Sequence, residues 1–265
     1  MGRDPRRAGA GVSAFTPDCR LVDEVRPAAN FDELRDGQEP EILLLHDTGM
    51  ASTEAACERL VSAESQVSCH YVVLEDGRIL QLVPEKLRAW HAGLSSWDGE
   101  TDVNSRSIGV EISNPGHDHG YPDFPAVQIE AVTALSRDIC ERWSIRPEMV
   151  LAHSDVAPKR KDDPGEKFPW GRLARGGVGH WVAPTDLNAK GAGIGPGDEG
   201  EPVEHLQAMF SMYGYGVEIT GSYDAGTAKV VTAFQRHFRP AKVDGLADFS
   251  TIETLRRLLA ALPKR

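Results

Sequence analysis

The spacing of apolar residues changes several times along the first two thirds of the chain, and each change predicts a different element. Glu41–His46 (EILLLH) is a short apolar run that ends in a polar residue, which is typical of a buried strand. The runs His70–Leu74 and Arg78–Val83 flank Asp76-Gly77, a dipeptide that favours a two-residue hairpin turn. Two further strands are expected at Ser107–Ser113 and Met149–His153.

Helical spacing occurs between these strands. Ser52–Ser62 has helical character, and Pro125–Trp143 predicts a long helix with Pro125 in its first turn. Val132, Leu135 and Ile139 share one face of that helix. The fold class expected is therefore α/β (mixed), with a central mixed β-sheet flanked by helices.

The composition changes at Val182–Glu201, where Gly, Pro, Ala and charged residues predict a linker. We expect an N-terminal extension at 1–24, a large α/β domain at 25–181, the linker at 182–201 and a small all-α domain at 202–265. Three helices are predicted in this last domain, at Val203–Tyr213, at Asp224–Phe238 with Asp224 as the N-cap, and at Ser250–Leu259, which opens with a capping box.

The segment Ala152–Trp170 (AHSDVAPKRKDDPGEKFPW) follows neither apolar period and carries His153, Lys161 and Asp163. His46 ends an apolar strand in the same way as His153. Two histidines and one carboxylate form a set that holds catalytic zinc and leaves one position open for water. A histidine at a strand end is more often a hydrogen-bonded structural residue, so the spacing alone leaves both interpretations open.

Further polar residues in this domain also have two interpretations each. Glu111 lies within a strand pattern and is either a solvent-facing residue or a general base beside the metal. Lys161 is either a solvated loop lysine or a stabiliser of an oxyanion. Trp90 and His91 either form a platform for a sugar or peptide, or are a buried tryptophan beside a loop histidine.

Composition narrows the class of ligand. The net charge of −11 argues against nucleic acid and disfavours an anionic membrane surface. The four cysteines are scattered without a C-x-x-C pair, and we expect reduced core residues rather than a disulfide framework. No stretch approaches the roughly 18 apolar residues of a membrane span, and no signal-peptide core is visible, which favours a cytoplasmic location.

Several long motifs resemble one known family. LLLHDTG, SCHYVVLEDGRILQLVPE, RAWHAG, NSRSIGVEISNPG and the segment 152–170 occur in the order found in zinc-dependent N-acetylmuramoyl-L-alanine amidases of the amidase-2 family. That family shares its fold with phage lysozyme-type amidases and peptidoglycan recognition proteins. The resemblance covers roughly residues 25–181. The tail, with HLQAMFSMYGY, TAKVVTAFQRHF and VDG, resembles a three-helix peptidoglycan-binding module.

The resemblance implies roles for individual residues. It makes His46, His153 and Asp163 the ligands of one catalytic Zn²⁺. It makes Glu111 the acid/base residue and Lys161 the stabiliser of the intermediate. It places Trp90, His91 and Asn114 in the substrate cleft. Two departures are Asp47, where many relatives have an aromatic residue, and Cys69, where relatives often have a smaller one.

The implied reaction is hydrolysis of the lactyl amide bond between N-acetylmuramic acid, or its 1,6-anhydro form, and L-alanine. Expected partners are peptidoglycan or muropeptide fragments; the oligomeric state and the preferred substrate stay open. Alternatives are a non-catalytic peptidoglycan recognition protein on the same fold and a zinc amidase or peptidase for another peptide. The binding module favours the periplasm or cell envelope over the cytoplasm, so the two indications of location conflict.

Overall fold

The computed structural model describes residues 15–34 and 37–263, so residues 1–14 of the expected N-terminal extension lie outside the described part. The strands are β1 (Glu24–Val25), β2 (Phe31–Glu33), β3 (Ile42–Asp47), β4 (Tyr71–Val73), β5 (Ile79–Gln81), β6 (Leu87–Ala89), β7 (Ser107–Ile112) and β8 (Val150–Ala152). The helices are α1 (Thr53–Val61), α2 (Ala126–Trp143), α3 (His153–Val156), α4 (Trp170–Arg175), α5 (Glu201–Tyr213), α6 (Ala225–Phe238) and α7 (Phe249–Ala260).

Six strands form one mixed sheet in the order β1-β5-β4-β7-β3-β8, and β2 and β6 form a separate two-stranded ribbon. Neighbours in the large sheet run parallel except β4 and β5, which are the antiparallel hairpin predicted around Asp76-Gly77. Because β4, β7, β3 and β8 are parallel, their carboxyl ends meet at one edge of the sheet. The mixed α/β class is confirmed.

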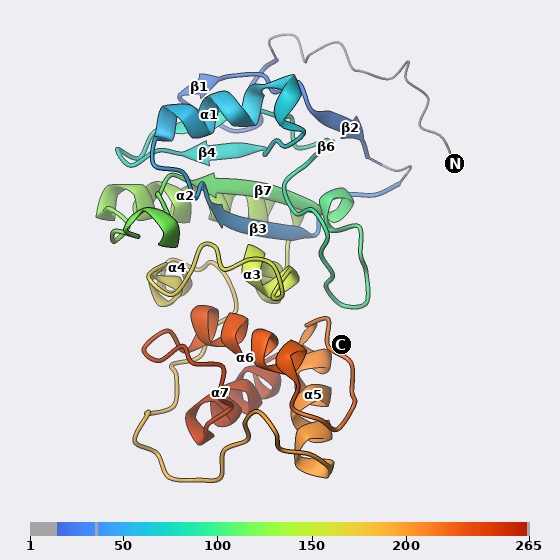
Figure 1. Cartoon of the computed structure of the whole chain (residues 1–265). Coiled ribbons are helices and arrows are strands. Elements are labelled where there is room, and N and C mark those ends of the chain that lie inside the picture. Colours follow the sequence, from blue (N-terminus) through green and yellow to red (C-terminus); the bar gives the residue numbers. More distant parts are fainter. Residues whose placement is uncertain (1–14, 35–36, 264–265) are drawn as a thin grey trace.

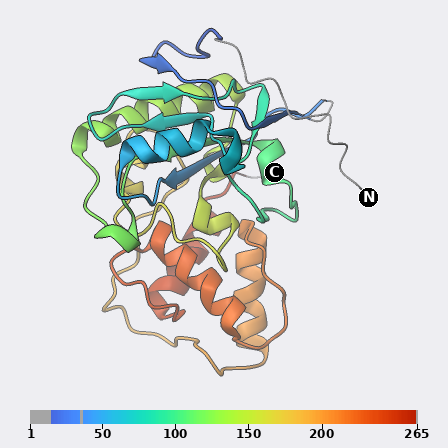
Figure 2. The ribbon, with the colours of Figure 1, turned by 45° about the horizontal axis from the view of Figure 1, so that its top comes forward.

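Helices cover both faces of the sheet (Figures 1 and 2). The side chains of β4 alternate between the faces, as the period of a strand requires. Val72 packs with Leu60 of α1 in one apolar cluster, while Tyr71 and Val73 join Ile129 of α2 in the other. Each face of the sheet therefore has its own apolar layer.

A buried carboxylate ties the end of α2 to the sheet. Glu85 is 1% exposed and accepts hydrogen bonds from the Arg142 guanidinium, from Trp143 Nε1 at 2.6 Å and from the Tyr71 hydroxyl at 2.7 Å. Burial alone would raise the pKa of Glu85, but these donors hold it below its usual value. Glu85 is thus a charged anchor between two layers of the fold.

The three C-terminal helices lie directly against the α/β part, below α3 and α4 in Figure 1. Phe234 and Phe238 of α6 belong to the same apolar cluster as Val156, Phe168 and Trp170. Residues 182–200 contain no helix or strand and run along the C-terminal helices, where Ile194 pairs with Ala247. Residues 182–200 have the irregular structure of a linker, but the two parts of the chain that they join share one core.

Three details differ from the sequence predictions. His153 was expected to end a strand, but β8 stops at Ala152 and His153 begins α3. Pro125 is the N-cap of α2 and not a residue of its first turn. The helix expected from Ser250 begins at Phe249 because the Asp248 side chain accepts from Thr251 N and caps it. Ser250 instead donates to Thr185 O.

The N-cap predicted for α6 is confirmed. Asp224 caps α6 by accepting from Thr227 N at 2.7 Å. All four cysteines are free; Cys57 and Cys69 are buried, and Cys19 and Cys140 are half-buried. Within residues 15–34 and 37–263, no helix combines the length and apolar character that crossing a membrane requires.

Candidate active site

The register of the parallel strands brings the key side chains to one face. His46 of β3 is the register partner of Glu111 of β7, and Leu45 of β3 is the partner of Ala152 of β8. Partners in register share a face of the sheet, so His46 and Glu111 point to the same side. His153 follows Ala152 and therefore lies next to His46 at the strand ends. The strand patterns thus account for the meeting of residues from three distant segments.

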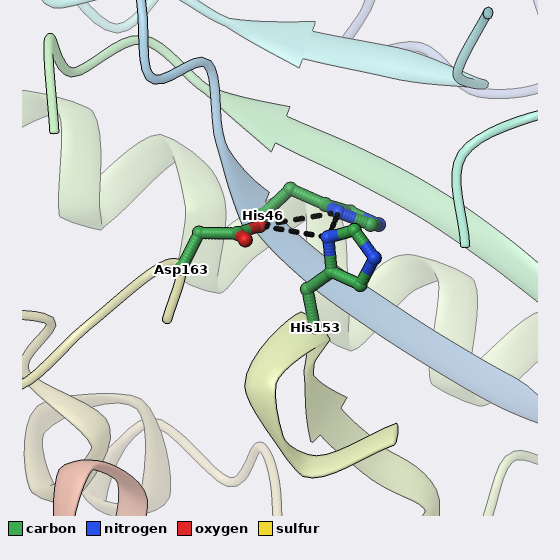
Figure 3. Close-up of side chains that lie close together, drawn as sticks. All are labelled: His46, His153 and Asp163. Carbon is green, nitrogen blue, oxygen red and sulfur yellow. Dashed lines mark hydrogen bonds and ion pairs between the residues drawn. The ribbon is translucent and has the colours of Figure 1, made fainter. Parts of the chain in front are cut away.

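Two histidines and one carboxylate converge at this edge (Figure 3). His46 Nδ1 lies 2.9 Å from His153 Nδ1 and 3.4 Å from Asp163 Oδ2, and His153 Nδ1 lies 3.0 Å from the same oxygen. All three residues are buried, and their ligand atoms all lie within 4.8 Å of one another. This is the trio that the sequence brought forward as metal ligands.

The partners of the outer ring nitrogens indicate that the trio fits a cation. His153 Nε2 lies 3.1 Å from Ala92 O, which accepts only, so Nε2 carries the proton and Nδ1 presents a lone pair. His46 Nε2 lies 3.0 Å from His91 Nδ1 and can donate in the same way. Two imidazole lone pairs and a carboxylate oxygen then face one point, an arrangement that a metal ion satisfies.

The electrostatics agree with a neutral His46 beside an ionised Asp163. Burial, reinforced by His153, lowers the pKa of His46 to about 4. Burial works in the opposite direction on Asp163, but His153 and His46 hold its pKa well below the usual range. His46 and Asp163 are therefore in their metal-binding protonation states at neutral pH.

Glu111 stands beside the trio with an unused oxygen. Its Oε2 is buried without a hydrogen-bond partner, whereas nearly all buried polar atoms in proteins have one. Burial, with Asp163 and Asp47 nearby, raises the pKa of Glu111 well above its usual range. Asp47 behaves similarly, since burial and Asp163 raise its pKa to about 8. Carboxyl groups in a cleft whose pKa values are strongly shifted are typical of catalytic sites.

A cavity of about 330 Å³ opens onto these groups. It is lined by Asp47, Thr48, Met50, Ala56, Arg59, Leu60, Val67, Ser68, Trp90, His91, Glu111, His153, Lys161 and Asp163. Helix α1 forms one wall, where Arg59 is exposed and makes no ion pair within residues 15–34 and 37–263. Lys161 lies on the loop formed by residues 153–170, here called the ligand loop, and lines the same cavity. The site therefore combines two cations, Arg59 and Lys161, with the acidic groups.

The three residues expected in the substrate cleft have different positions. Trp90 lines the cavity and donates from Nε1 to Asp32 Oδ2 at 2.8 Å. His91 also reaches the cavity, but its ring lies behind His46; a Cβ at position 109 would come within 2.5 Å of that ring, so Gly109 leaves the space.

Asn114 is not among the described residues that line the cavity, and its expected contact with substrate stays a prediction. Its amide nitrogen donates to Pro122 O at 3.0 Å, and its Oδ1 accepts from Gly116 N at 3.0 Å. Both polar ends of this buried side chain therefore hold the loop after β7. The sequence pattern could not distinguish a loop-holding amide from a substrate-contacting one.

Two residues were not singled out by the sequence. Arg59 has an ordinary place in a helical pattern, and nothing in the sequence shows that its helix forms a wall of the cavity. Asp155 lies two residues after His153, is fully buried, and accepts from Ala152 N at 2.8 Å. The usual signal for such a helix start is a polar N-cap residue, and Ala152 supplies none.

Comparison with known proteins agrees with this site. Residues 36–166 match the family described as N-acetylmuramoyl-L-alanine amidase, and residues 199–255 match a peptidoglycan binding domain. The curated amidase AmiD of Escherichia coli is 40% identical over 200 residues, covering 71% of this chain and 72% of AmiD. The 1,6-anhydro-N-acetylmuramyl-L-alanine amidase AmpD of Salmonella typhimurium is 32% identical and covers 59% of this chain and 92% of AmpD.

Solved structures give the same result. AmiD of E. coli, in complex with anhydro-N-acetylmuramic acid-L-Ala-D-gamma-Glu-L-Lys, superposes with a TM-score of 0.72 at 37% identity, covering 85% of this chain and 91% of that one. AmpDH3 of Pseudomonas aeruginosa, with an anhydromuramic pentapeptide, gives 0.71 at 30% identity, covering 86% and 94%. Fold and site define an amide hydrolase with a buried trio that could hold a metal ion. The chain belongs to the N-acetylmuramoyl-L-alanine amidase family.

Proposed function

We propose that this chain is a zinc enzyme that hydrolyses the lactyl amide bond between N-acetylmuramic acid, in its normal or 1,6-anhydro form, and L-alanine. The observation that carries the proposal is the trio of His46, His153 and Asp163, whose donor atoms face one point with both outer imidazole nitrogens occupied. Two nitrogens and one carboxylate oxygen form a set typical of catalytic zinc. A bound zinc ion would supply a Lewis acid for the scissile carbonyl and the attacking water.

The chain's own residues have complementary tasks in this proposal. Glu111, held beside the trio on β7, takes the proton of the attacking water and delivers it to the leaving amine of L-alanine. Lys161 lines the same cavity and stabilises negative charge on the carbonyl oxygen. His91 orients His46 through the 3.0 Å contact between their ring nitrogens, so its proposed role is positioning and not substrate contact.

Arg59 supports an acidic peptide as the substrate. AmiD binds a ligand in which D-glutamate is linked through its γ-carboxyl, and such a residue keeps a free α-carboxylate. Arg59 projects from α1 at the wall of the cavity and is free of ion pairs within the described ranges. We assign it to a carboxylate of the stem peptide, which guanidinium groups bind in a bidentate manner.

Metal analysis combined with a cleavage assay tests the function. The purified chain should contain one zinc per molecule and release L-alanyl peptide from a muropeptide. A chelator should abolish release, and added Zn²⁺ should restore it. Release that persists at full rate without metal would contradict zinc catalysis, and muropeptide binding without cleavage by the zinc-loaded chain would favour a recognition protein.

A substrate comparison addresses the role of the C-terminal helices. We propose that the chain acts on fragments and on polymeric peptidoglycan, because residues 199–255 match a peptidoglycan binding domain. Rates on anhydro-muropeptides and on intact sacculi should both be measurable. Cleavage restricted to soluble anhydro-muropeptides would contradict a role in anchoring to the polymer.

A further inference from the structure

A fully buried carboxylate joins the metal site to the C-terminal helices. Asp155 lies in α3, two residues after His153. Its Oδ1 accepts from the Tyr215 hydroxyl at 2.6 Å, and its Oδ2 lies 2.6 Å from His237 Nδ1. Tyr215 and His237 belong to the C-terminal part and are 2% and 3% exposed. Both oxygens of this carboxylate therefore have partners from outside the α/β domain.

The phenol and the imidazole are themselves held firmly. Burial and Asp155 raise the pKa of Tyr215 well above its usual range, so the phenol keeps its proton and donates. The ring of Tyr215 also packs against Trp97, with centroids 5.0 Å apart. His237 stacks on Trp170, with centroids 3.7 Å apart and planes 25° from parallel.

Helix α6 contacts the ligand loop at more than one point. His237 reaches Asp155 near the start of the segment 153–170 and Trp170 at its end. The neighbouring Arg236 lies 3.5 Å from Glu166 in the middle of the segment. This segment supplies two of the three metal ligands, His153 and Asp163. Two neighbouring residues of α6 thus contact the start, the middle and the end of the loop that carries them.

Helix α3 depends on contacts with other elements because it is short and has no polar N-cap residue. It has four residues, and a helix this short is unstable by itself. Its N-cap position is Ala152, which has no side-chain acceptor, so Asp155 supplies the bond to Ala152 N at 2.8 Å. The orientation of Asp155 therefore determines how the first residue of α3, the ligand His153, is presented to the metal.

We propose that Tyr215 and His237 are positioning residues of the metal site: the C-terminal part fixes Asp155, and through α3 it fixes the ligand His153. The C-terminal helices are then a component of the catalytic apparatus in addition to any contact they make with peptidoglycan. This inference rests on the proposed metal role of His153. It makes metal affinity, and not only fold stability, dependent on two side chains of the C-terminal part.

Full-length variants with a matched control test the inference. Tyr215→Phe removes only the hydroxyl that reaches Asp155. Tyr213→Phe removes a hydroxyl at the same interface that bonds to His180 Nδ1 at 2.8 Å and does not touch Asp155. The dissociation constant for Zn²⁺, measured against a competing chelator, should rise about tenfold in Tyr215→Phe and stay within about twofold in Tyr213→Phe. On the zinc-loaded enzymes, kcat should fall with KM unchanged in Tyr215→Phe alone.

A second pair of variants keeps the test independent of folding losses. His237→Asn retains a donor near the place of Nδ1, while His237→Leu removes it. The asparagine variant should recover most of the zinc affinity that the leucine variant loses. Equal zinc affinity in all four variants and the wild type would overturn the inference, whatever their melting temperatures. A wild-type chain that binds no zinc would instead overturn the proposed function.

Discussion

Glu111 has the features expected of a proton carrier beside the proposed metal site. It shares a face of the sheet with His46, has a buried oxygen without a partner, and keeps a pKa well above that of an exposed glutamate. Near a divalent ion such a carboxyl can lose its proton to accept one from water, and then pass it on. The distinction between this role and metal binding can be measured.

Replacing Glu111 by glutamine should reduce kcat by about 10²- to 10⁴-fold, because the amide keeps the shape but cannot carry the proton. Zinc content should remain at one per chain, since the ligands are untouched. Muropeptide cleavage followed by chromatography, with metal analysis of the same sample, measures both. Turnover within a few fold of the wild type would contradict the assigned role.

Arg59 leads to a separate prediction about binding. Arg59→Ala should raise KM for an acidic muropeptide about fivefold and leave kcat unchanged, the size expected for an exposed charged contact of about 1 kcal/mol. Arg59→Lys retains the charge and should lie between the two. An unchanged KM in Arg59→Ala would show that the stem peptide lies elsewhere.

For single residues, the sequence indicated what chemistry a side chain offers more clearly than where that side chain lies in the fold. His46 and Glu111 lie in register on neighbouring parallel strands and therefore share a face, whereas Asp163 lies in a loop that no apolar period describes. The place of Asn114 in the substrate cleft stays a prediction, because an amide in a polar loop has the same sequence pattern whether it binds substrate or its own backbone. His91 lines the cavity, and the space left by Gly109 holds its ring beside His46.

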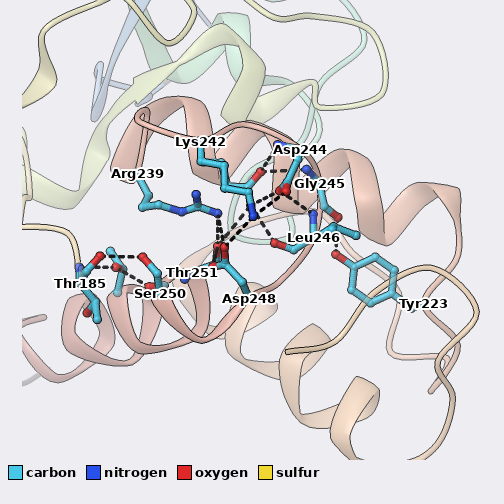
Figure 4. Close-up of polar contacts among 12 residues, drawn as sticks. Thr185, Tyr223, Arg239, Lys242, Asp244, Gly245, Leu246, Asp248, Ser250 and Thr251 are labelled. Atoms are coloured by element: carbon cyan, nitrogen blue, oxygen red, sulfur yellow. Dashed lines mark hydrogen bonds and ion pairs between the residues drawn. The ribbon is translucent and has the colours of Figure 1, made fainter. Parts of the chain in front are cut away.

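Among the elements, long periodic segments were predicted well and short ones poorly. β3, β7 and α2 lie close to their predicted bounds, whereas α3 was not expected, since its four residues have no period to detect. Helix α7 was assigned a start one residue late, at Ser250. The polar contacts around Asp248 explain this, because Thr251 and the cations Arg239 and Lys242 gather on the true N-cap (Figure 4).

The anchor between α2 and the sheet leads to a pH-dependent prediction. Glu85→Gln should reduce the free energy of unfolding by about 2 kcal/mol at neutral pH, since buried hydrogen bonds to a charged acceptor are lost. The pKa of Glu85 in the folded chain lies below its value of 4.5 in the unfolded chain. Its contribution is therefore complete above pH 4.5 and is lost as the pH falls through the lower, folded-state value.

Urea unfolding of wild type and variant at neutral and acidic pH checks this. The difference between them should narrow at acidic pH, where the wild-type carboxyl is protonated as well. Glu54→Gln is a control, because Glu54 is exposed and its 3.4 Å contact with Arg26 contributes little. A difference that stays constant over the whole pH range would contradict an ionised Glu85.

For the whole molecule, the sequence predicted two domains and a linker, and in the structure residues of both flanking parts belong to one apolar cluster. The composition of residues 182–201 correctly indicated irregular structure, but composition carries no information on whether the flanking parts pack together. The contacts that join them, such as Phe238 and Trp170 in one cluster and Asp155 with Tyr215, connect residues distant in sequence. Local patterns cannot reveal such pairings.

The shared core predicts a single cooperative unfolding transition. Scanning calorimetry of the full chain should give one peak whose calorimetric and van't Hoff enthalpies agree, because the C-terminal helices cannot leave without exposing the apolar surface of α3 and α4. Added zinc should shift the whole peak upward. Two resolved peaks, of which zinc moves only one, would contradict this coupling.

The direct packing of the C-terminal helices against the ligand loop also affects which amide bonds of the polymer would be cleaved. A binding module on a flexible linker allows a catalytic site to reach many bonds of a bound polymer. Here the C-terminal helices pack directly on the α/β part, so their orientation relative to the site is fixed. A glycan strand held by the C-terminal helices would meet the metal site at one distance and in one direction. The molecule would then cleave stem peptides at a constant distance from the point where the glycan strand is bound.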